Sequence, residues 1–131
     1  MFGKKSPPPI KSLIAQGTRI DGDLRFSEGL RIDGEVIGKI SALAEQPSIL
    51  VISEAAQVTG EIHADHIVIN GTVRGPVNAR ELLELQPRAR IEGDVSYRAL
   101  EMHQGATISG QLKPMEGAEE KPLLKLASNN P

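Results

Sequence analysis

The chain alternates in a short, regular way between inward-type and polar positions. From Ile14 to Leu112, two uncharged residues separated by a single residue recur about every six positions. A spacing of two is the side-chain period of a β-strand, so each pair predicts one short strand with both side chains on one face. Polar corners separate the pairs, which leaves each strand too short for a hairpin. From residue 50 onward the pairs are Leu50/Ile52, Ala56/Val58, Ile62/Ala64, Ile67/Ile69, Val73/Gly75, Val77/Ala79, Leu83/Leu85, Ala89/Ile91, Val95/Tyr97, Leu100/Met102 and Ala106/Ile108.

Three consecutive pairs make one winding of a coil. The steps between the first strands of successive windings are 18, 20, 17, 16 and 17 residues. A near-constant period of this size is typical of a parallel β-helix, in which each winding buries its inward face against its neighbours. The sequence therefore predicts an all-β, single-domain parallel β-helix of about six windings over residues 12–113. The superimposed first-strand positions are Ile14, Ile32, Ile52, Ile69, Leu85 and Met102.

Glycine recurs at the predicted corners. The segments 30–40 and 67–77 align without a gap, with glycine at the same two places in each. Glycine suits a corner where φ is positive or where the backbone approaches the next winding closely. Phosphate-binding glycine loops open onto a helix, and no helix is expected here. We therefore predict structural roles for Gly22, Gly34, Gly38, Gly60, Gly71, Gly75, Gly93 and Gly110.

The segments at both ends of the chain lack the repeat. Residues 1–11 contain three consecutive prolines, and residues 114–131 contain charges and further prolines, so both are expected to be disordered and to supply no strand. The apolar cluster at residues 123–126 is either a partner motif or a chance feature of a disordered tail. Residues 43–48 are extra to the register and predict a surface loop.

Composition agrees with a narrow coil. Aromatic residues make up 2% of the chain, which suits a lumen with little space for rings. The absence of cysteine and of a long apolar run favours a cytoplasmic protein without disulfides or a membrane-spanning segment. A formal net charge of −2 and a pI near 5.9 give no basic face for nucleic acid, so no nucleic-acid partner is expected.

Candidate catalytic or metal-binding chemistry is sparse. His63 and His66 have a spacing that suggests a metal site, but His63 and His103 each follow an inward residue and are expected to face solvent from different windings. His66 is expected at a corner. Three aspartates beside glycines, Asp21, Asp33 and Asp94, lack the pattern of calcium-binding β-rolls and are expected to form corner hydrogen bonds. We predict no catalytic residues, no metal and no cofactor.

Three segments resemble the bactofilins, bacterial polymer-forming cytoskeletal proteins. They are the Met-Phe-Gly-Lys-Lys start, the Ser-Leu-Ile-Ala-Gln-Gly-Thr-Arg-Ile-Asp-Gly-Asp-Leu segment (12–24) and the Leu-Arg-Ile-Asp-Gly-Glu-Val-Ile-Gly-Lys-Ile segment (30–40). The resemblance implies a right-handed β-helix that polymerises end to end without nucleotide into non-polar filaments. It also implies a peripheral position on the inner face of the cytoplasmic membrane, where the filaments scaffold cell-wall enzymes that control cell shape.

The physics of the fold points independently to self-association. The first and last windings of a β-helix expose unpaired strand edges and a slice of apolar lumen, and the sequence contains no evident capping element. Stacking these ends would bury both, whereas the alternative is a monomer or a non-polymerising adaptor whose tails cover the ends. The predicted polymerisation interface comprises Ile14, Thr18, Ile20, Leu24 and Phe26 at one end and Leu100, Met102, Ala106, Ile108 and Leu112 at the other.

The N-terminal peptide predicts a membrane contact. Met1 and Phe2 are placed to enter the lipid interface while Lys4, Lys5 and Lys11 meet anionic headgroups. Many copies on one filament would turn a weak contact into stable attachment. The alternative is an initiator methionine followed by an ordinary solvated linker.

A different class of protein shares the repeat. Left-handed β-helix enzymes, such as hexapeptide-repeat acyltransferases and related zinc enzymes, have a similar small-x-aliphatic spacing. The loop at 43–48, the placement of glycine two positions after the aliphatic residue, and the lack of a C-terminal helix argue against such an enzyme.

Overall fold

The computed structural model of the chain describes residues 8–115 and 123–124. These residues form strands and no helix, so no helix in this part of the chain is long and apolar enough to cross a membrane. The strands are β1 (Ser12–Ile14), β2 (Arg19–Asp21), β3 (Leu24–Phe26), β4 (Gly29–Ile32), β5 (Glu35–Ile37), β6 (Ile40–Ala42), β7 (Ile49–Ile52), β8 (Gln57–Thr59), β9 (Ile62–Ile69), β10 (Thr72–Arg74), β11 (Val77–Leu85), β12 (Arg90–Glu92), β13 (Val95–Met102), β14 (Thr107–Ser109), β15 (Leu112–Pro114) and β16 (Leu123–Leu124).

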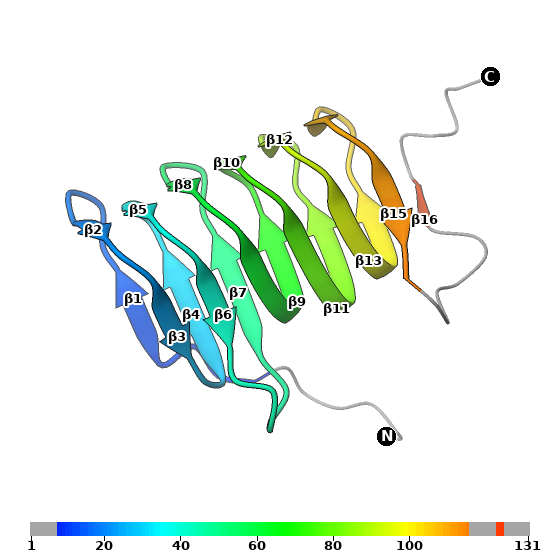
Figure 1. The fold of residues 1–131 in the computed structure, drawn as a ribbon. Coiled ribbons are helices and arrows are strands. Elements are labelled where there is room, and N and C mark those ends of the chain that lie inside the picture. Colours follow the sequence, from blue (N-terminus) through cyan, green and yellow to red (C-terminus); the bar gives the residue numbers. More distant parts are fainter. Residues whose placement is uncertain (1–7, 116–122, 125–131) are drawn as a thin grey trace.

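The strands coil into a solenoid in which each winding pairs with the next (Figure 1). One sheet of six strands runs in the order β2-β5-β8-β10-β12-β14. A second sheet of ten strands contains the path β1-β4-β7-β9-β11-β13-β15, with β3 and β6 pairing beside it. Strand pairs are parallel throughout the described residues, so the predicted parallel β-helix of about six windings is confirmed.

The predicted register between windings is also confirmed. Parallel pairing aligns the first-strand residues of all six windings into one column whose side chains point into the lumen. A second inward column runs through the six-stranded sheet and has Ile20 at one end and Ile108 at the other. The first column is Ile14, Ile32, Ile52, Ile69, Leu85 and Met102.

The lumen is filled by thin aliphatic side chains. Among the described residues, each of the two aromatic side chains has a small residue as its register partner on an adjacent strand. Phe26 pairs with Ala42, and Tyr97 pairs with Ala79. A large residue beside a small one keeps the cross-section of the coil nearly constant. Burial raises the pKa of Tyr97 because the charged phenolate would lose its hydration there.

Some predicted corners are continuous strand instead. The chain crosses from one pair to the next without interruption in β9, β11 and β13, which span 8, 9 and 8 residues. A register shift between Ala79 and Leu82 absorbs the extra residue at this bend, as a β-bulge does. In the earlier windings the chain leaves the sheet, at residues 27–28 and at the predicted loop 43–48.

The corner glycines form a ladder along one edge of the coil. A Cβ atom on Gly60 would collide with the carbonyl group of Gly38, and Gly75 stands in the same relation to Gly60. Gly60 also has a φ of 146°, which L side chains rarely adopt. Both constraints hold for Gly38, Gly60, Gly75 and Gly93 and explain the structural role predicted for them. The close approach alone applies at Gly34, Gly71 and Gly110, and the positive φ alone at Gly22.

The C-terminal segment differs from the prediction. Leu123 and Leu124 form β16, which pairs with Glu101 and Met102 at the outer edge of β13. The expectation that residues 114–131 supply no strand is therefore wrong at these two positions and at Pro114, the last residue of β15. The unpaired backbone groups at the edge of β13 provide hydrogen-bonding partners for any nearby extended segment.

Candidate polymerisation interface

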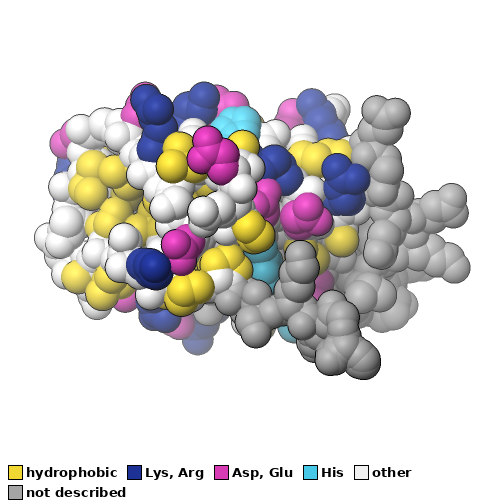
Figure 2. All heavy atoms as spheres, turned by 90° about the horizontal axis from the view of Figure 1, so that it is seen from below, with side chains coloured by type: hydrophobic (Ala, Val, Ile, Leu, Met, Phe, Trp, Pro, Cys, Tyr) yellow, Lys and Arg dark blue, Asp and Glu magenta, His cyan; other side chains and the backbone are white. Residues whose placement is uncertain are grey.

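The N-terminal end of the coil is an open sheet edge. Within the described residues, β1, β2 and β3 each pair with a strand on one side only. Figure 2 shows hydrophobic side chains gathered at this end, over the winding that Figure 1 draws in blue. Of the predicted interface residues here, Ile14 and Phe26 are buried, Ile20 and Leu24 are partly exposed, and Thr18 is exposed.

Two neighbouring residues extend this end beyond the prediction. Leu13 is 56% exposed because it alternates with Ser12 and Ile14 along β1 and points outward. Lys11 belongs to the rim: its backbone N–H donates to the Gly29 carbonyl at 3.0 Å, and its Nζ lies 3.2 Å from a carboxylate oxygen of Glu28. The sequence places Lys11 among the cations of the N-terminal peptide, but in the structure Lys11 contacts Glu28 and Gly29 at the start of the second winding.

The predicted interface residues at the C-terminal end differ in their exposure. Leu112 is 44% exposed, and Met102 and Ile108 are partly exposed. Leu100 and Ala106, at 1% and 5%, are buried in the single chain, as Ile14 and Phe26 are at the other end. The C-terminal face of the described residues therefore centres on Met102, Ile108 and Leu112.

Aspartate side chains join the terminal windings to their neighbours. Asp94 accepts a hydrogen bond from the backbone N–H of Gln111 at 2.9 Å and lies 3.2 Å from Lys113 Nζ. These contacts, the Gln111 N–H first, hold the pKa of Asp94 below its usual value. Asp23 accepts from the Lys39 N–H at 3.0 Å in the same way at the other end of the coil.

A second lowered carboxyl pKa belongs to Asp33. A hydrogen bond from Ser53 is the largest cause of the lowered pKa of Asp33. Desolvation raises this pKa, and Arg31, whose Nε lies 2.9 Å from the carboxylate, lowers it further. The predicted corner hydrogen bonding therefore accounts for both Asp33 and Asp94.

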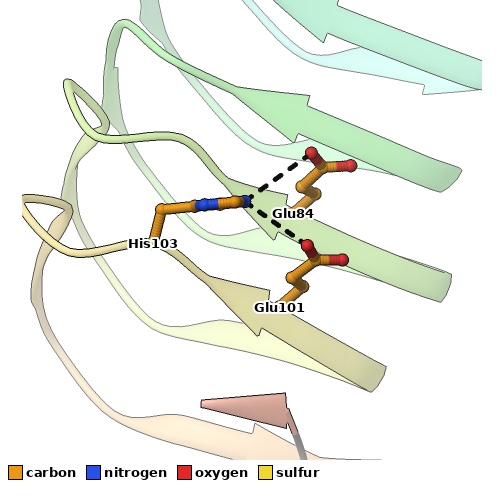
Figure 3. A group of neighbouring side chains, drawn as sticks. All are labelled: Glu84, Glu101 and His103. Atoms are coloured by element: carbon orange, nitrogen blue, oxygen red, sulfur yellow. Dashed lines mark ion pairs between the residues drawn. The ribbon is translucent and has the colours of Figure 1, made fainter. Parts of the chain in front are cut away.

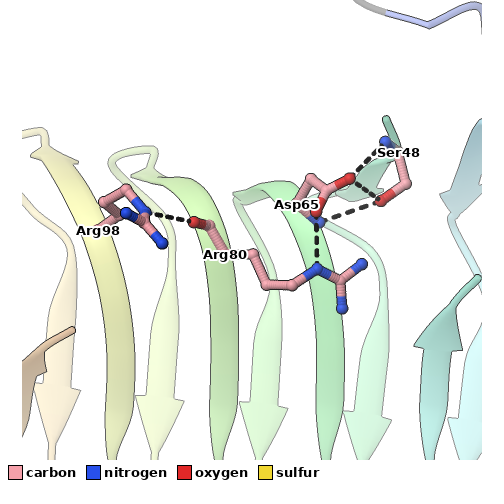
Figure 4. Close-up of polar contacts among 4 residues, drawn as sticks. All are labelled: Ser48, Asp65, Arg80 and Arg98. Carbon is pink, nitrogen blue, oxygen red and sulfur yellow. Dashed lines mark hydrogen bonds and ion pairs between the residues drawn. The ribbon is translucent and has the colours of Figure 1, made fainter. Parts of the chain in front are cut away.

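A polar ladder anchors the loop at residues 43–48 to the side of the coil (Figure 4). Asp65 accepts from the backbone N–H of Ser48 at 3.0 Å and from Arg80 Nε at 2.7 Å, and Arg98 Nε donates to the Arg80 carbonyl at 3.1 Å. Ser48 is only 1% exposed, so the end of the predicted surface loop is buried. Sequence reasoning missed this ladder, although Ser48 and Asp65 are one winding apart, at the 17-residue separation of the repeat.

His63 and His66, whose spacing suggests a metal site in the sequence, have different partners in the structure. His63 Nε2 lies 2.6 Å from Glu61 on its own winding, whereas His66 lies within β9 and not at a corner. His66 Nε2 is 3.7 Å from Glu84. His103 is close to the same carboxylate and to Glu101, as Figure 3 shows.

The proposed membrane-binding residues lie outside the described part of the chain. They are Met1, Phe2, Lys4 and Lys5. Their role stays a prediction from the sequence.

The geometry defines a class of protein: an open-ended parallel β-helix whose two faces present unpaired strands and apolar side chains. The bactofilin family model, described as polymer-forming cytoskeletal, matches residues 12–113. The chain belongs to the bactofilin family, which is structural rather than enzymatic, and this assignment favours a scaffold over a β-helix enzyme.

Two curated relatives come from Myxococcus xanthus (strain DK1622). Bactofilin BacO is 29% identical over 111 residues, which cover 85% of each chain. Bactofilin BacP is 24% identical over 101 residues, which cover 77% of this chain and 40% of BacP. The comparison with solved structures returned no match.

Proposed function

We propose that this protein assembles end to end into nucleotide-independent, non-polar filaments on the inner face of the cytoplasmic membrane, where it positions cell-wall enzymes that shape the cell. Membership of a polymer-forming family supports self-assembly. The observation that carries the end-to-end geometry is that, among the described residues, the outermost strands β1, β2, β14 and β15 lack a neighbour on one side.

The free energy of such a junction has an identifiable source. Each aliphatic side chain that becomes fully buried contributes about 1.5–3 kcal/mol, and the two ends present several partly exposed ones. Pairing of the strand edges adds backbone hydrogen bonds. Together these contributions offset the entropic cost of association, so no bound nucleotide is required for the junction.

Membrane attachment and client binding rest on the sequence and on the family resemblance. The N-terminal peptide combines an aromatic residue with two lysines and no acidic residue. A filament would present many copies of this peptide to the same surface, which raises the overall affinity without any new contact.

A pair of matched substitutions tests the end-to-end junction. Ile20 and Ile108 occupy opposite ends of one inward column, and both are partly exposed in the single chain. An arginine at either position can reach water in the free subunit but would be buried and unpaired in a junction. We expect Ile20→Arg and Ile108→Arg to fold and to fail to form filaments, as measured by negative-stain microscopy and light scattering.

The same variants determine filament polarity. In a non-polar filament, each single variant retains one isologous junction and forms dimers, and only the double variant is monomeric. In a head-to-tail filament, each single variant is a monomer, and mixing the two gives heterodimers. Ile69→Arg, at a fully buried position in the middle of the same coil, is the control and should unfold the chain. Normal filaments from Ile20→Arg and Ile108→Arg would contradict the proposed junction.

A further inference from the structure

We propose that Glu84, Glu101 and His103 bind one divalent transition-metal ion, with Zn²⁺ as the best fit, on the outer side of the fifth and sixth windings. Glu84 and Glu101 are register partners on the parallel strands β11 and β13, and His103 follows two residues after Glu101. Their candidate ligand atoms lie within 4.8 Å of one another, and all three side chains are partly buried. The argument for this site does not rest on the proposed filament junction.

The Glu84 carboxylate lies beside a second carboxylate and creates a demand for positive charge. Residues in register on adjacent parallel strands project on the same side of the sheet, about 4.8 Å apart between strands. Like charges in such a pair destabilise it. Among the described residues, the basic side chains within 4.0 Å of the Glu84 carboxylate are those of His66 and His103, and no lysine or arginine lies that close.

The position of the His103 ring fits a shared ion better than a hydrogen bond. His103 Nε2 is 3.4 Å from Glu101 and 4.0 Å from Glu84, and Figure 3 shows it directed between the two carboxylates. His63 and Glu61 have the same two-residue separation, yet their atoms approach to 2.6 Å. Ligand atoms around a tetrahedral ion with bonds of about 2.0–2.1 Å lie about 3.3–3.5 Å from one another.

The ring nitrogens give a second, independent indication. The Nε2 atoms of His66 and His103 are both shielded from solvent, and neither has a hydrogen-bond partner. A buried polar atom without a partner calls for a missing water or ion. His66 Nε2 lies 3.7 Å and His103 Nε2 4.0 Å from Glu84, so two nitrogens without a hydrogen bond lie beside one carboxylate.

The ligand set selects the class of metal. Imidazole nitrogen suits zinc and neighbouring transition ions, whereas calcium and magnesium prefer an all-oxygen shell. Three protein ligands leave a coordination position open for water. Gln86 Nε2 donates to Glu84 at 2.6 Å and would orient this carboxylate, as outer-sphere partners do in zinc sites.

A bound ion would join two windings by side-chain ligands. Glu84 belongs to β11, whereas Glu101 lies near the end of β13 and His103 directly follows that strand, on the winding that carries the C-terminal face. Because only the folded chain brings these ligands together, binding stabilises the native state by mass action. The site would therefore tie metal availability to the stability of the terminal winding.

The test uses the full chain without a histidine tag, after treatment with a chelator. Co²⁺ serves as the probe because its visible absorption reports coordination, and Zn²⁺ is used to displace it. We expect one Co²⁺ per chain and a loss of affinity of about tenfold or more in Glu101→Gln and His103→Gln, since even outer-sphere changes cost about that much. Zn²⁺ should raise the thermal midpoint of the wild type but not that of His103→Gln.

The matched controls are Glu61→Gln and His63→Gln, which alter the hydrogen-bonded pair of the same spacing. We expect both to bind Co²⁺ like the wild type. Circular dichroism verifies that each variant is folded. If His103→Gln does not fold, the test uses Glu101→Gln alone, because this substitution keeps the size of the side chain. Equal affinity of the wild type and Glu101→Gln, a loss of binding in His63→Gln, or no saturable binding at one ion per chain would each overturn the proposal.

Discussion

Gly60 combines the two constraints that a residue in this coil can face. Its φ of 146° is in a region that only glycine populates readily, and a Cβ atom would collide with the Gly38 carbonyl of the preceding winding. We expect Gly60→Ala to lower the free energy of unfolding by more than the roughly 1–3 kcal/mol that strained backbone alone costs. Chemical denaturation followed by circular dichroism measures this loss.

Gly22 provides the matched control. It has nearly the same φ, 142°, but a Cβ atom there would have no neighbour within 4 Å, because no winding precedes it. Gly22→Ala should therefore show the backbone cost without the collision. Equal losses for the two variants would mean that close approach between windings does not limit this corner.

Asp94 makes the stability of the last winding depend on pH. Its pKa is lowered in the folded chain, chiefly by the Gln111 N–H and then by Lys113. The ionised carboxylate therefore stabilises the fold above the unfolded-state pKa of about 3.9, and this contribution is lost as the pH falls through the folded-state pKa. We expect Asp94→Asn to lower the thermal midpoint at neutral pH and to converge with the wild type in acid.

The control for Asp94 is Asp21→Asn. Asp21 pairs with Arg19 at 3.3 Å within one exposed strand and bridges no windings, so this variant should have a smaller effect at neutral pH. A difference between Asp94→Asn and the wild type that stays constant down to strong acid would exclude the carboxylate charge as the cause.

At the scale of the strands, the sequence predicted the register because each inward position is repeated in every winding. It could not predict where two strands fuse into one. The bend between Ala79 and Leu82 is a bulge within β11, and polar residues occur at bends and at true corners alike. The two-residue β16 was missed for a related reason: a pairing this short has no periodic signal, and it depends on the edge that β13 offers.

Strand β16 leads to a prediction about assembly. It occupies the outer edge of β13 at Glu101 and Met102, which an adjoining subunit would need for strand pairing across the junction. Removing residues 116–131 should free this edge and lower the protein concentration at which filaments form. Light scattering over a dilution series measures this threshold.

Leu124→Pro is the control that preserves the length of the chain. Proline removes a backbone donor from β16, so the variant should shift the assembly threshold in the same direction. A higher threshold after truncation would instead assign the C-terminal segment to the junction itself.

For the whole molecule, the sequence predicted which inward side chains end the columns of the coil, but not which outward side chains contact one another. Ile20 and Ile108 follow from the repeat, because the last member of a periodic column is known once the period is known. The contacts of Ser48 with Asp65, and of His103 with Glu84, join outward side chains on neighbouring windings. Outward positions have no shared residue pattern, so these contacts become visible only when the windings are stacked.

The last prediction concerns attachment to the membrane. Residues 2–5 precede the first strand, β1, so their removal should spare filament formation and abolish binding to anionic vesicles. Replacing Lys4 and Lys5 by serine should weaken binding in a salt-dependent way, because exposed charges are screened over about 8–10 Å at physiological ionic strength. Phe2→Ala should weaken binding with less salt dependence, since it removes apolar insertion. Vesicle co-sedimentation at two salt concentrations measures these effects.

Assembly and attachment should be coupled through the number of peptides on one particle. Ile108→Arg leaves residues 1–7 unchanged, yet it should reduce vesicle binding because a dimer or monomer presents far fewer copies than a filament. If Ile108→Arg blocked filaments and still bound vesicles like the wild type, a single peptide would suffice for attachment. If the chain without residues 2–5 bound vesicles fully, the membrane contact would belong to the β-helix body instead.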